Sequence, residues 1–141
     1  MRRFSTALLL IVLFGAILAG VLPMLPAADA PSDRVLVMYF HRTQRCPTCL
    51  KMGGYSEEAV KAGFPEQIQQ GIVAFHYVNF EDPRNAALAR GYNILGPTLI
   101  VAKVSNNRVL RYANLTEIWT KVRDKEAFLK YVRDQVTAML Q

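Results

Sequence analysis

The spacing of the two cysteines constrains the fold of this chain more than any other feature. Both lie in one CPTC motif at residues 46–49, directly after a run of β-branched and aromatic residues, Arg34 to Phe40. Such a run predicts a buried strand, and a proline in the second position of the motif suits the first turn of a helix. At a helix start this spacing lets the sulfurs meet, with Cys46 exposed and Cys49 tucked against the helix.

This placement predicts redox chemistry. The unpaired amides of a first helical turn favour a thiolate at Cys46, and we expect Arg42 and Arg45 to act in the same direction. His41 is a further candidate for tuning this thiolate, although a histidine at a strand end is more often a spectator. Cys46 then attacks a partner disulfide and Cys49 resolves the mixed disulfide, or the steps run in reverse.

Three other uses of the cysteine pair stay open. A structural disulfide is one, but so short a loop constrains the unfolded chain little. Zinc needs four ligands, and the chain has only two histidines, His41 and His76, to add to the two cysteines. Copper(I) accepts two thiolates, with His41 or Met52 in support. We expect no bound metal or cofactor in the leading interpretation.

The elements after the motif are predicted as follows. The helix runs to about Gly63 with a kink or break at Gly53-Gly54, and a second strand spans Ile72 to Phe80. Asp82-Pro83 caps a short helix, Arg84 to Arg90, that Gly91 ends. Strands at Thr98 to Val104 and Arg108 to Tyr112 flank a turn at 105–107, and Asp124 caps a final helix.

The predicted order, β-α-β-α-β-β-α, indicates an α/β fold. Two parallel strands joined by a crossover helix, then an antiparallel hairpin and a closing helix, describe a mixed four-stranded sheet flanked by helices. The loop from His41 to Arg45 joins the first strand to the redox helix.

The chain resembles the thioredoxin superfamily over Arg34 to Leu140. The resemblance rests on the CxxC motif after the first strand and on the YNILGPTL segment, residues 92–99. It implies that Pro97 is cis, faces the redox pair and belongs to the catalytic site. Gly96, with Pro47 and Thr48, then lines a permissive groove for a partner chain.

A narrower resemblance rests on three further segments: YFH at 39–41 ahead of RCPTC, NLTEIW at 114–119 and DKEAF at 124–128. These look like the small exported bacterial family catalogued as the ArsF subunit of a nitrophenyl-compound nitroreductase. The label implies a role in an assembly, since nothing in these residues can hold a flavin or a nitroaromatic compound.

One departure from the superfamily concerns proton transfer. Many thioredoxins carry a buried aspartate on the first strand beneath the second cysteine, whereas the strand at 34–40 has no acid. Deprotonation of Cys49 must then rely on water or on another residue, for which Glu57 and Glu58 are the candidates.

The first thirty residues predict export. Arg2 and Arg3 precede an uncharged apolar stretch from Ala7 to Leu22, as in a signal peptide cut after Ala28 or Ala30. Without the cut, the span to Ala28 is long enough to cross a bilayer, and we favour such an anchor. Residues 1–30 are therefore leader and linker, and residues 31–141 form one domain outside the cytoplasm.

The expected partner is a protein. From Pro31 onward the chain has 15 basic and 10 acidic residues, spread along the sequence, without the arginine-rich block of a nucleic-acid binder. We expect exchange with a dithiol or disulfide protein or with a membrane electron donor. Trp119 is a candidate for lining the partner surface.

Overall fold

The sheet has four strands. A computed structural model of the chain describes residues 31–141. Within it the sheet has the order β2-β1-β3-β4, with β1 parallel to β2 and antiparallel to β3, and β3 antiparallel to β4. The strands are β1 (Asp33–His41), β2 (Val73–Asn79), β3 (Thr98–Ser105) and β4 (Arg108–Asn114).

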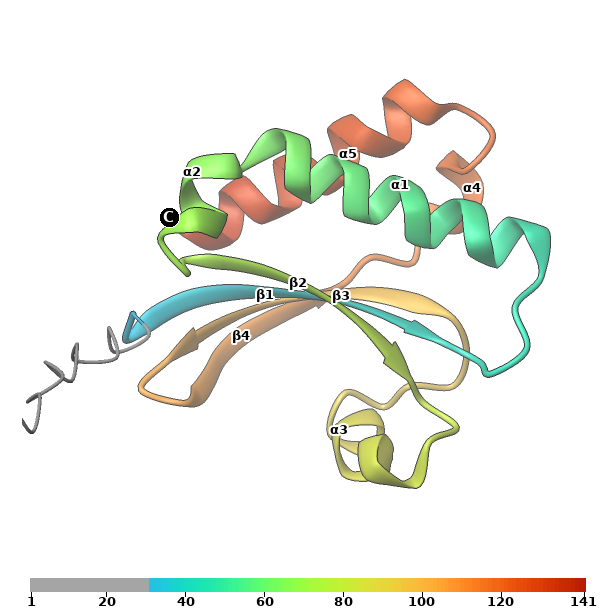
Figure 1. Ribbon diagram of the computed structural model, residues 1–141, viewed down its shortest axis with the longest axis horizontal. Helices are drawn as coiled ribbons and strands as arrows, with labels where there is room; N and C mark the ends of the chain where they lie inside the picture. The colour runs from blue at the N-terminus through green and yellow to red at the C-terminus, as the bar shows by residue number, and fades with distance from the viewer. Residues whose placement is uncertain (1–30) are drawn as a thin grey trace, which may run out of the picture.

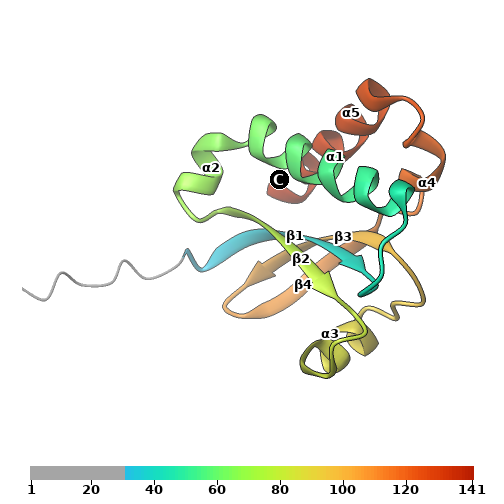
Figure 2. The same cartoon turned by 45° about the vertical axis from the view of Figure 1, so that its right-hand side comes forward.

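The helices cover the two faces of this sheet unequally. They are α1 (Pro47–Gly63), α2 (Pro65–Gln69), the 3₁₀ turn η1 (Pro83–Asn85), α3 (Ala86–Gly91), α4 (Ile118–Lys121) and α5 (Lys125–Leu140). Figures 1 and 2 show α1, α2, α4 and α5 on one face and α3 alone on the other. The predicted thioredoxin-like α/β fold with a mixed four-stranded sheet is confirmed.

Strand β1 is central and has a core on each side. Val35, Val37 and Tyr39 pack in the core beneath α1 and α5, and Met38 and Phe40 pack in the smaller core on the α3 side. All five side chains are buried. Burial of an apolar side chain of this size stabilises a fold by about 1.5–3 kcal/mol, which explains why the strand lacks the polar alternation of a surface strand.

The first helix differs from the prediction. It runs without a break from Pro47 to Gly63, through Gly53 and Gly54. A glycine in a helix interior costs only about 1 kcal/mol relative to alanine, which the packing of α1 against the sheet and α5 can offset. Of the kink or break predicted at the glycine pair, the break does not occur.

Other differences lie at short elements. The helix predicted after Asp82 is a 3₁₀ turn followed by α3, although Asp82 caps it as expected, accepting from the Arg84 amide at 2.9 Å. The sequence did not predict α2 or α4, which are five and four residues long. The predicted hairpin turn is confirmed, since Asn106 and Asn107 have φ of 49° and 60°.

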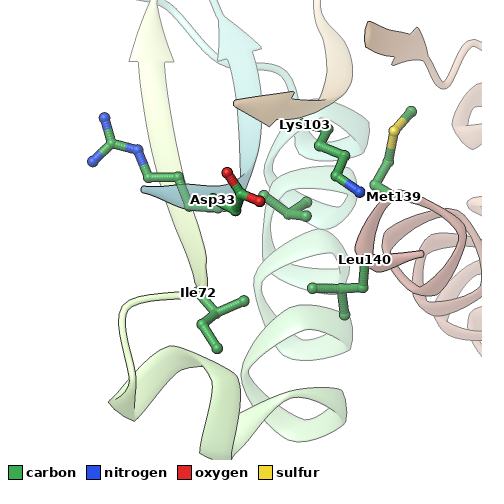
Figure 3. Close-up of a pocket in the computed structure, with 7 residues that line it drawn as sticks. Asp33, Ile72, Lys103, Met139 and Leu140 are labelled. Atoms are coloured by element: carbon green, nitrogen blue, oxygen red, sulfur yellow. The ribbon is translucent and has the colours of Figure 1, made fainter. Parts of the chain in front are cut away.

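The described chain enters the sheet at the end of the central strand β1 that is farthest from the cysteines. Asp33 starts β1 and His41 ends it, so Cys46 follows from the opposite end of the strand. A small cavity of ≈ 90 Å³ lies at the entry end, lined in part by Asp33, Ile72 and Leu140 (Figure 3). The predicted leader, residues 1–30, lies outside the described residues. Within residues 31–141, no helix has the length and apolar character needed to cross a bilayer.

The N-cap of α5 gives a test of the fold. The Asp124 side chain accepts a hydrogen bond from the Ala127 amide at 3.0 Å. We expect Asp124→Ala to lower the free energy of unfolding by about 1 kcal/mol, measured by urea denaturation, because this amide loses its acceptor. Asp124→Asn keeps a capping oxygen and is expected to stay near the wild type. Equal losses in both variants would contradict the capping role.

Candidate functional site

Cys46 is the N-cap residue of α1. Its backbone is extended, with φ −73° and ψ 159°, and its Sγ accepts a hydrogen bond from the Cys49 amide at 3.1 Å. Pro47 follows in the first turn, where a missing amide hydrogen costs nothing. No acidic side chain lies in this turn, so no carboxylate competes with the sulfur for the free amides.

The two thiols have different surroundings. Both cysteines are free, Cys46 exposed and Cys49 buried. Interaction with the Cys49 thiol, and then with the backbone amides of Cys49 and Thr48, lowers the pKa of the Cys46 thiol. Burial, followed by the hydrogen bond to Cys46, raises the pKa of the Cys49 thiol. The predicted direction at Cys46 is confirmed, and the first cysteine is the better nucleophile of the pair.

Arg42 does not act on Cys46 in the way the sequence suggested. Its guanidinium pairs with Glu81 at 3.1 Å and stacks on the Phe80 ring at 5.5 Å. Glu81 also accepts from the Thr43 amide at 2.9 Å. These contacts tie the loop before Cys46 to the chain that follows β2. The arginine charge is neutralised there, and it is not among the causes of the lowered Cys46 pKa.

Arg45 and His41 also point to aromatic partners. The Arg45 guanidinium lies over the Tyr77 ring at 5.0 Å and the Tyr39 ring at 5.7 Å. The His41 ring stacks near Tyr39, and its Nδ1 lies 2.8 Å from the Arg42 carbonyl oxygen. The amides and the Cys49 thiol lower the Cys46 pKa, in place of the predicted guanidinium groups.

Tyr39, on the first strand, contacts the backbone of the second cysteine. Its hydroxyl donates to the Cys49 carbonyl oxygen at 2.8 Å, and burial raises the pKa of this phenol, so it stays protonated. Counting every second residue along the strand places Tyr39 on the face that α1 covers, but the sequence alone does not show its bond to Cys49. The residue holds the backbone of the second cysteine.

The two glutamates proposed for Cys49 have other partners. Glu57 pairs with Lys61 at 2.6 Å and accepts from the Tyr77 hydroxyl at 2.9 Å, while Glu58 pairs with Lys125 at 2.9 Å. The hydrogen bonds from Lys61 and then Tyr77 lower the pKa of Glu57. Neither carboxylate contacts Cys49, so the suggestion that one of them takes its proton is not supported by their contacts.

The Pro97 segment lies at the same end of the sheet as the cysteines. Thr98, directly after it, pairs with Phe40 near the end of β1. The peptide bond before Pro97 is trans, as all bonds within the described residues are, so the predicted cis bond is wrong. The trans form is the ordinary preference of a prolyl bond, and here the Pro97 carbonyl accepts from the Trp119 indole at 3.0 Å.

Two separate grooves occur at this end. One, of ≈ 650 Å³, is lined by the loop at 42–47 together with Glu81, and so includes Cys46 and Pro47. The other, of ≈ 480 Å³, contains Gly96, Pro97 and Trp119. Thr48 is exposed at the start of α1, and a side chain added at Gly96 would meet only open space. Of the residues predicted to line one substrate groove, Pro47 and Gly96 lie in different grooves and Thr48 lines neither of these two.

The geometry offers little to a metal ion. Among the residues that the structure describes, no group of three or more His, Cys, Asp or Glu side chains could hold one. His76 is exposed on β2, and Met52 is fully buried in the core beneath α1. What the site presents is an exposed thiol with a lowered pKa beside a buried thiol with a raised pKa.

The fold and the site together define a thioredoxin-like domain with a CxxC pair at a helix start. No protein-family model matches the chain, and no curated protein matches it either. Among solved structures, the chain is similar to human ERp44 form I, with 20% identity over 74% of this chain and a TM-score of 0.49. The match spans a quarter of the length of the ERp44 chain.

Two smaller proteins show a similar level of likeness. Mitochondrial thioredoxin 3 of Saccharomyces cerevisiae is 16% identical, with 74% of this chain and 79% of that chain covered and a TM-score of 0.44. Fasciola hepatica thioredoxin is 22% identical, with 72% and 84% covered and a TM-score of 0.42. The assignment of the fold rests on strand order and direction.

The asymmetry of the two thiols predicts a pH profile. In the reduced full chain, kept in detergent, we expect alkylation of Cys46 to reach its half-maximal rate below pH about 8.5, the ordinary thiol value, and alkylation of Cys49 above it. Mass spectrometry of peptides assigns each site.

The same shift affects stability. Because folding lowers the Cys46 pKa, ionisation of this thiol stabilises the folded dithiol form at pH values above the ordinary thiol pKa. This contribution is lost as the pH falls through the folded-state pKa. Equal profiles at the two sites would contradict the assignment.

The hydrogen bond from Tyr39 gives a second test. We expect Tyr39→Phe to lower the free energy of unfolding of the reduced chain by about 1 kcal/mol, since a buried carbonyl loses a donor. Tyr77→Phe is the matched control, because the Tyr77 hydroxyl donates, in an exposed hydrogen bond, to the side chain of Glu57 on α1 and not to a buried carbonyl. Urea denaturation measures both. A loss at Tyr77 as large as that at Tyr39 would show that burial of the Tyr39 bond has no special effect.

Proposed function

We propose that the protein is a thiol:disulfide oxidoreductase that exchanges electrons with a partner protein through Cys46 and Cys49. One observation carries this proposal: the exposed Cys46 sulfur caps α1 and accepts from the Cys49 amide at 3.1 Å. This arrangement stabilises a thiolate and leaves it open to an approaching disulfide.

The first step forms a mixed disulfide. The Cys46 thiolate attacks one sulfur of the partner disulfide, whose S–S bond breaks as the new bond to Cys46 forms. The second partner sulfur leaves as a thiolate and takes a proton from water. The free amides at the start of α1 stabilise the attacking anion, whose charge passes to the leaving sulfur as the new bond forms.

The second step releases the partner. Cys49 loses its proton to water and attacks the Cys46 sulfur, and the remaining partner sulfur leaves as a thiolate. The protein then holds the disulfide and the partner has gained two electrons. Run in reverse, the same bonds oxidise a partner dithiol. The raised pKa of Cys49 keeps this thiol protonated until Cys46 is bonded and can no longer hold a negative charge.

The location and partner class follow from the leader and form part of the proposal. We infer an extracytoplasmic domain, held by the N-terminal segment at the outer face of the cytoplasmic membrane or released into the periplasm. In such a compartment a CxxC pair cycles with exported thiol proteins or with a membrane electron donor. The domain needs no cofactor for this exchange.

A finer assignment is proposed on the sequence segments alone. The YFH, NLTEIW and DKEAF segments favour the exported bacterial family catalogued as the ArsF subunit of a nitrophenyl-compound nitroreductase. Within such an assembly the domain would pass electrons between protein thiols. Any nitroaromatic chemistry would belong to other subunits.

Trapping of the partner tests the proposal. In the full chain expressed in a bacterial host, Cys49→Ser is expected to accumulate covalent adducts that a reductant dissolves, because the mixed disulfide at Cys46 is no longer resolved. Cys46→Ser is the matched control and should trap none. Equilibration of the wild-type chain with glutathione buffers should also give one two-electron transition. The absence of both adducts and transition would overturn the proposal.

A further inference from the structure

Arg45 is half-buried and has an unusual environment. Its Nε atom is buried without a hydrogen-bond partner in the described structure. The guanidinium lies instead over the rings of Tyr39 on β1 and Tyr77 on β2. A guanidinium stays charged in proteins, and the negative faces of two aromatic rings compensate for part of its lost hydration.

Gly53 makes room for this side chain. A Cβ at Gly53 would lie 2.6 Å from Arg45 Nη2, 2.9 Å from Tyr77 Cε1 and 3.0 Å from Tyr39 Cε1. At Gly54, one residue later in the same helix, a Cβ would meet nothing within 4 Å. Glycine weakens a helix at both positions, but only at Gly53 does its lack of a side chain permit a close contact. We call Tyr39, Arg45, Gly53 and Tyr77 the arginine cage.

The cage touches the backbone of both cysteines. Arg45 directly precedes Cys46, and the Tyr39 hydroxyl donates to the Cys49 carbonyl at 2.8 Å. Upstream, the loop is held by the pairing of Arg42 with Glu81 and by the bond from the Thr43 amide. Arg45 is the last residue of the loop, and its side-chain contacts therefore fix the end of the loop at the point where α1 begins.

We propose that Arg45 is a positioning residue, whose enclosure by Tyr39, Tyr77 and Gly53 places the Cys46 sulfur over the free amides of α1. This inference rests on the proposed function and adds a determinant of the reactivity of Cys46. The flat guanidinium fills the space between the two rings. Lysine keeps the charge but has no planar group for this stacking.

Other charged groups near the cage are engaged elsewhere. His41 on β1 stacks beside Tyr39, and Glu57 on α1 is bonded by Lys61 and by the Tyr77 hydroxyl. The loop contributes the pair of Arg42 and Glu81. A substitution at Gly53 displaces Arg45 and also crowds the rings of Tyr77 and Tyr39, while the number of charges stays the same.

The test separates position from charge. The pH dependence of Cys46 alkylation is measured on the reduced full chain in detergent for Arg45→Ala, Arg45→Lys, Gly53→Ala and Gly54→Ala. We expect the first three to move the midpoint upward by about 0.5–1 pH unit, the effect of weakening a hydrogen bond to the thiolate. Gly54→Ala is the matched control and should not move it. Arg45→Ala combined with Gly53→Ala should shift it no further than Arg45→Ala alone.

Each contrary outcome has a distinct meaning. A shift in Arg45→Ala with none in Gly53→Ala or Arg45→Lys would overturn the positioning role in favour of a simple charge effect. An equal shift in Gly54→Ala would overturn it in favour of a general effect on α1. Circular dichroism checks folding, and Arg45→Lys carries the test if a shorter side chain unfolds the chain. If the wild-type chain does not form and lose its disulfide reversibly in glutathione buffer, the proposed function itself is contradicted.

Discussion

The hydrogen bond from the Cys49 amide to the Cys46 sulfur connects the fold to the chemistry. It exists because β1 ends just before a helix whose N-cap is a cysteine, so that an amide left free by helix geometry bonds a sulfur. The same bond gives the two cysteines unequal environments. Because Cys46 and Cys49 lie three residues apart at the first turn of α1, one thiol is exposed and ionises readily while the other is buried and stays neutral.

Much of this arrangement could be predicted from the sequence. The strand before the motif, the proline in the first turn, the asparagine turn and the aspartate caps each act through local chemistry that a residue carries with it. For the same reason the acidity of Cys46 had the predicted direction. The amide contribution depends only on the position of the cysteine at a helix start.

The remaining features depend on contacts between segments that are distant in the sequence. Arg42 was expected to face the thiolate, but its partner is Glu81, which lies beyond β2. The lysine partner of Glu57 lies one turn away on α1, as the helical spacing of the sequence allows, whereas the partner of Glu58 is Lys125 on α5, which the sequence alone does not place beside it. Tyr39 was overlooked because its role appears only when α1 lies across β1. The trans bond before Pro97 shows that a residue matched by resemblance need not share the conformation the family implies.

The direction of β1 has a consequence for the reach of the molecule. Asp33 and Cys46 are at opposite ends of a nine-residue strand, which spans roughly 30 Å. In the proposed anchored form, the tether joins the domain at the end of β1 remote from the sulfur. The length of the strand then separates the attachment point from the reactive thiol, which favours partner cysteines that project from the membrane surface.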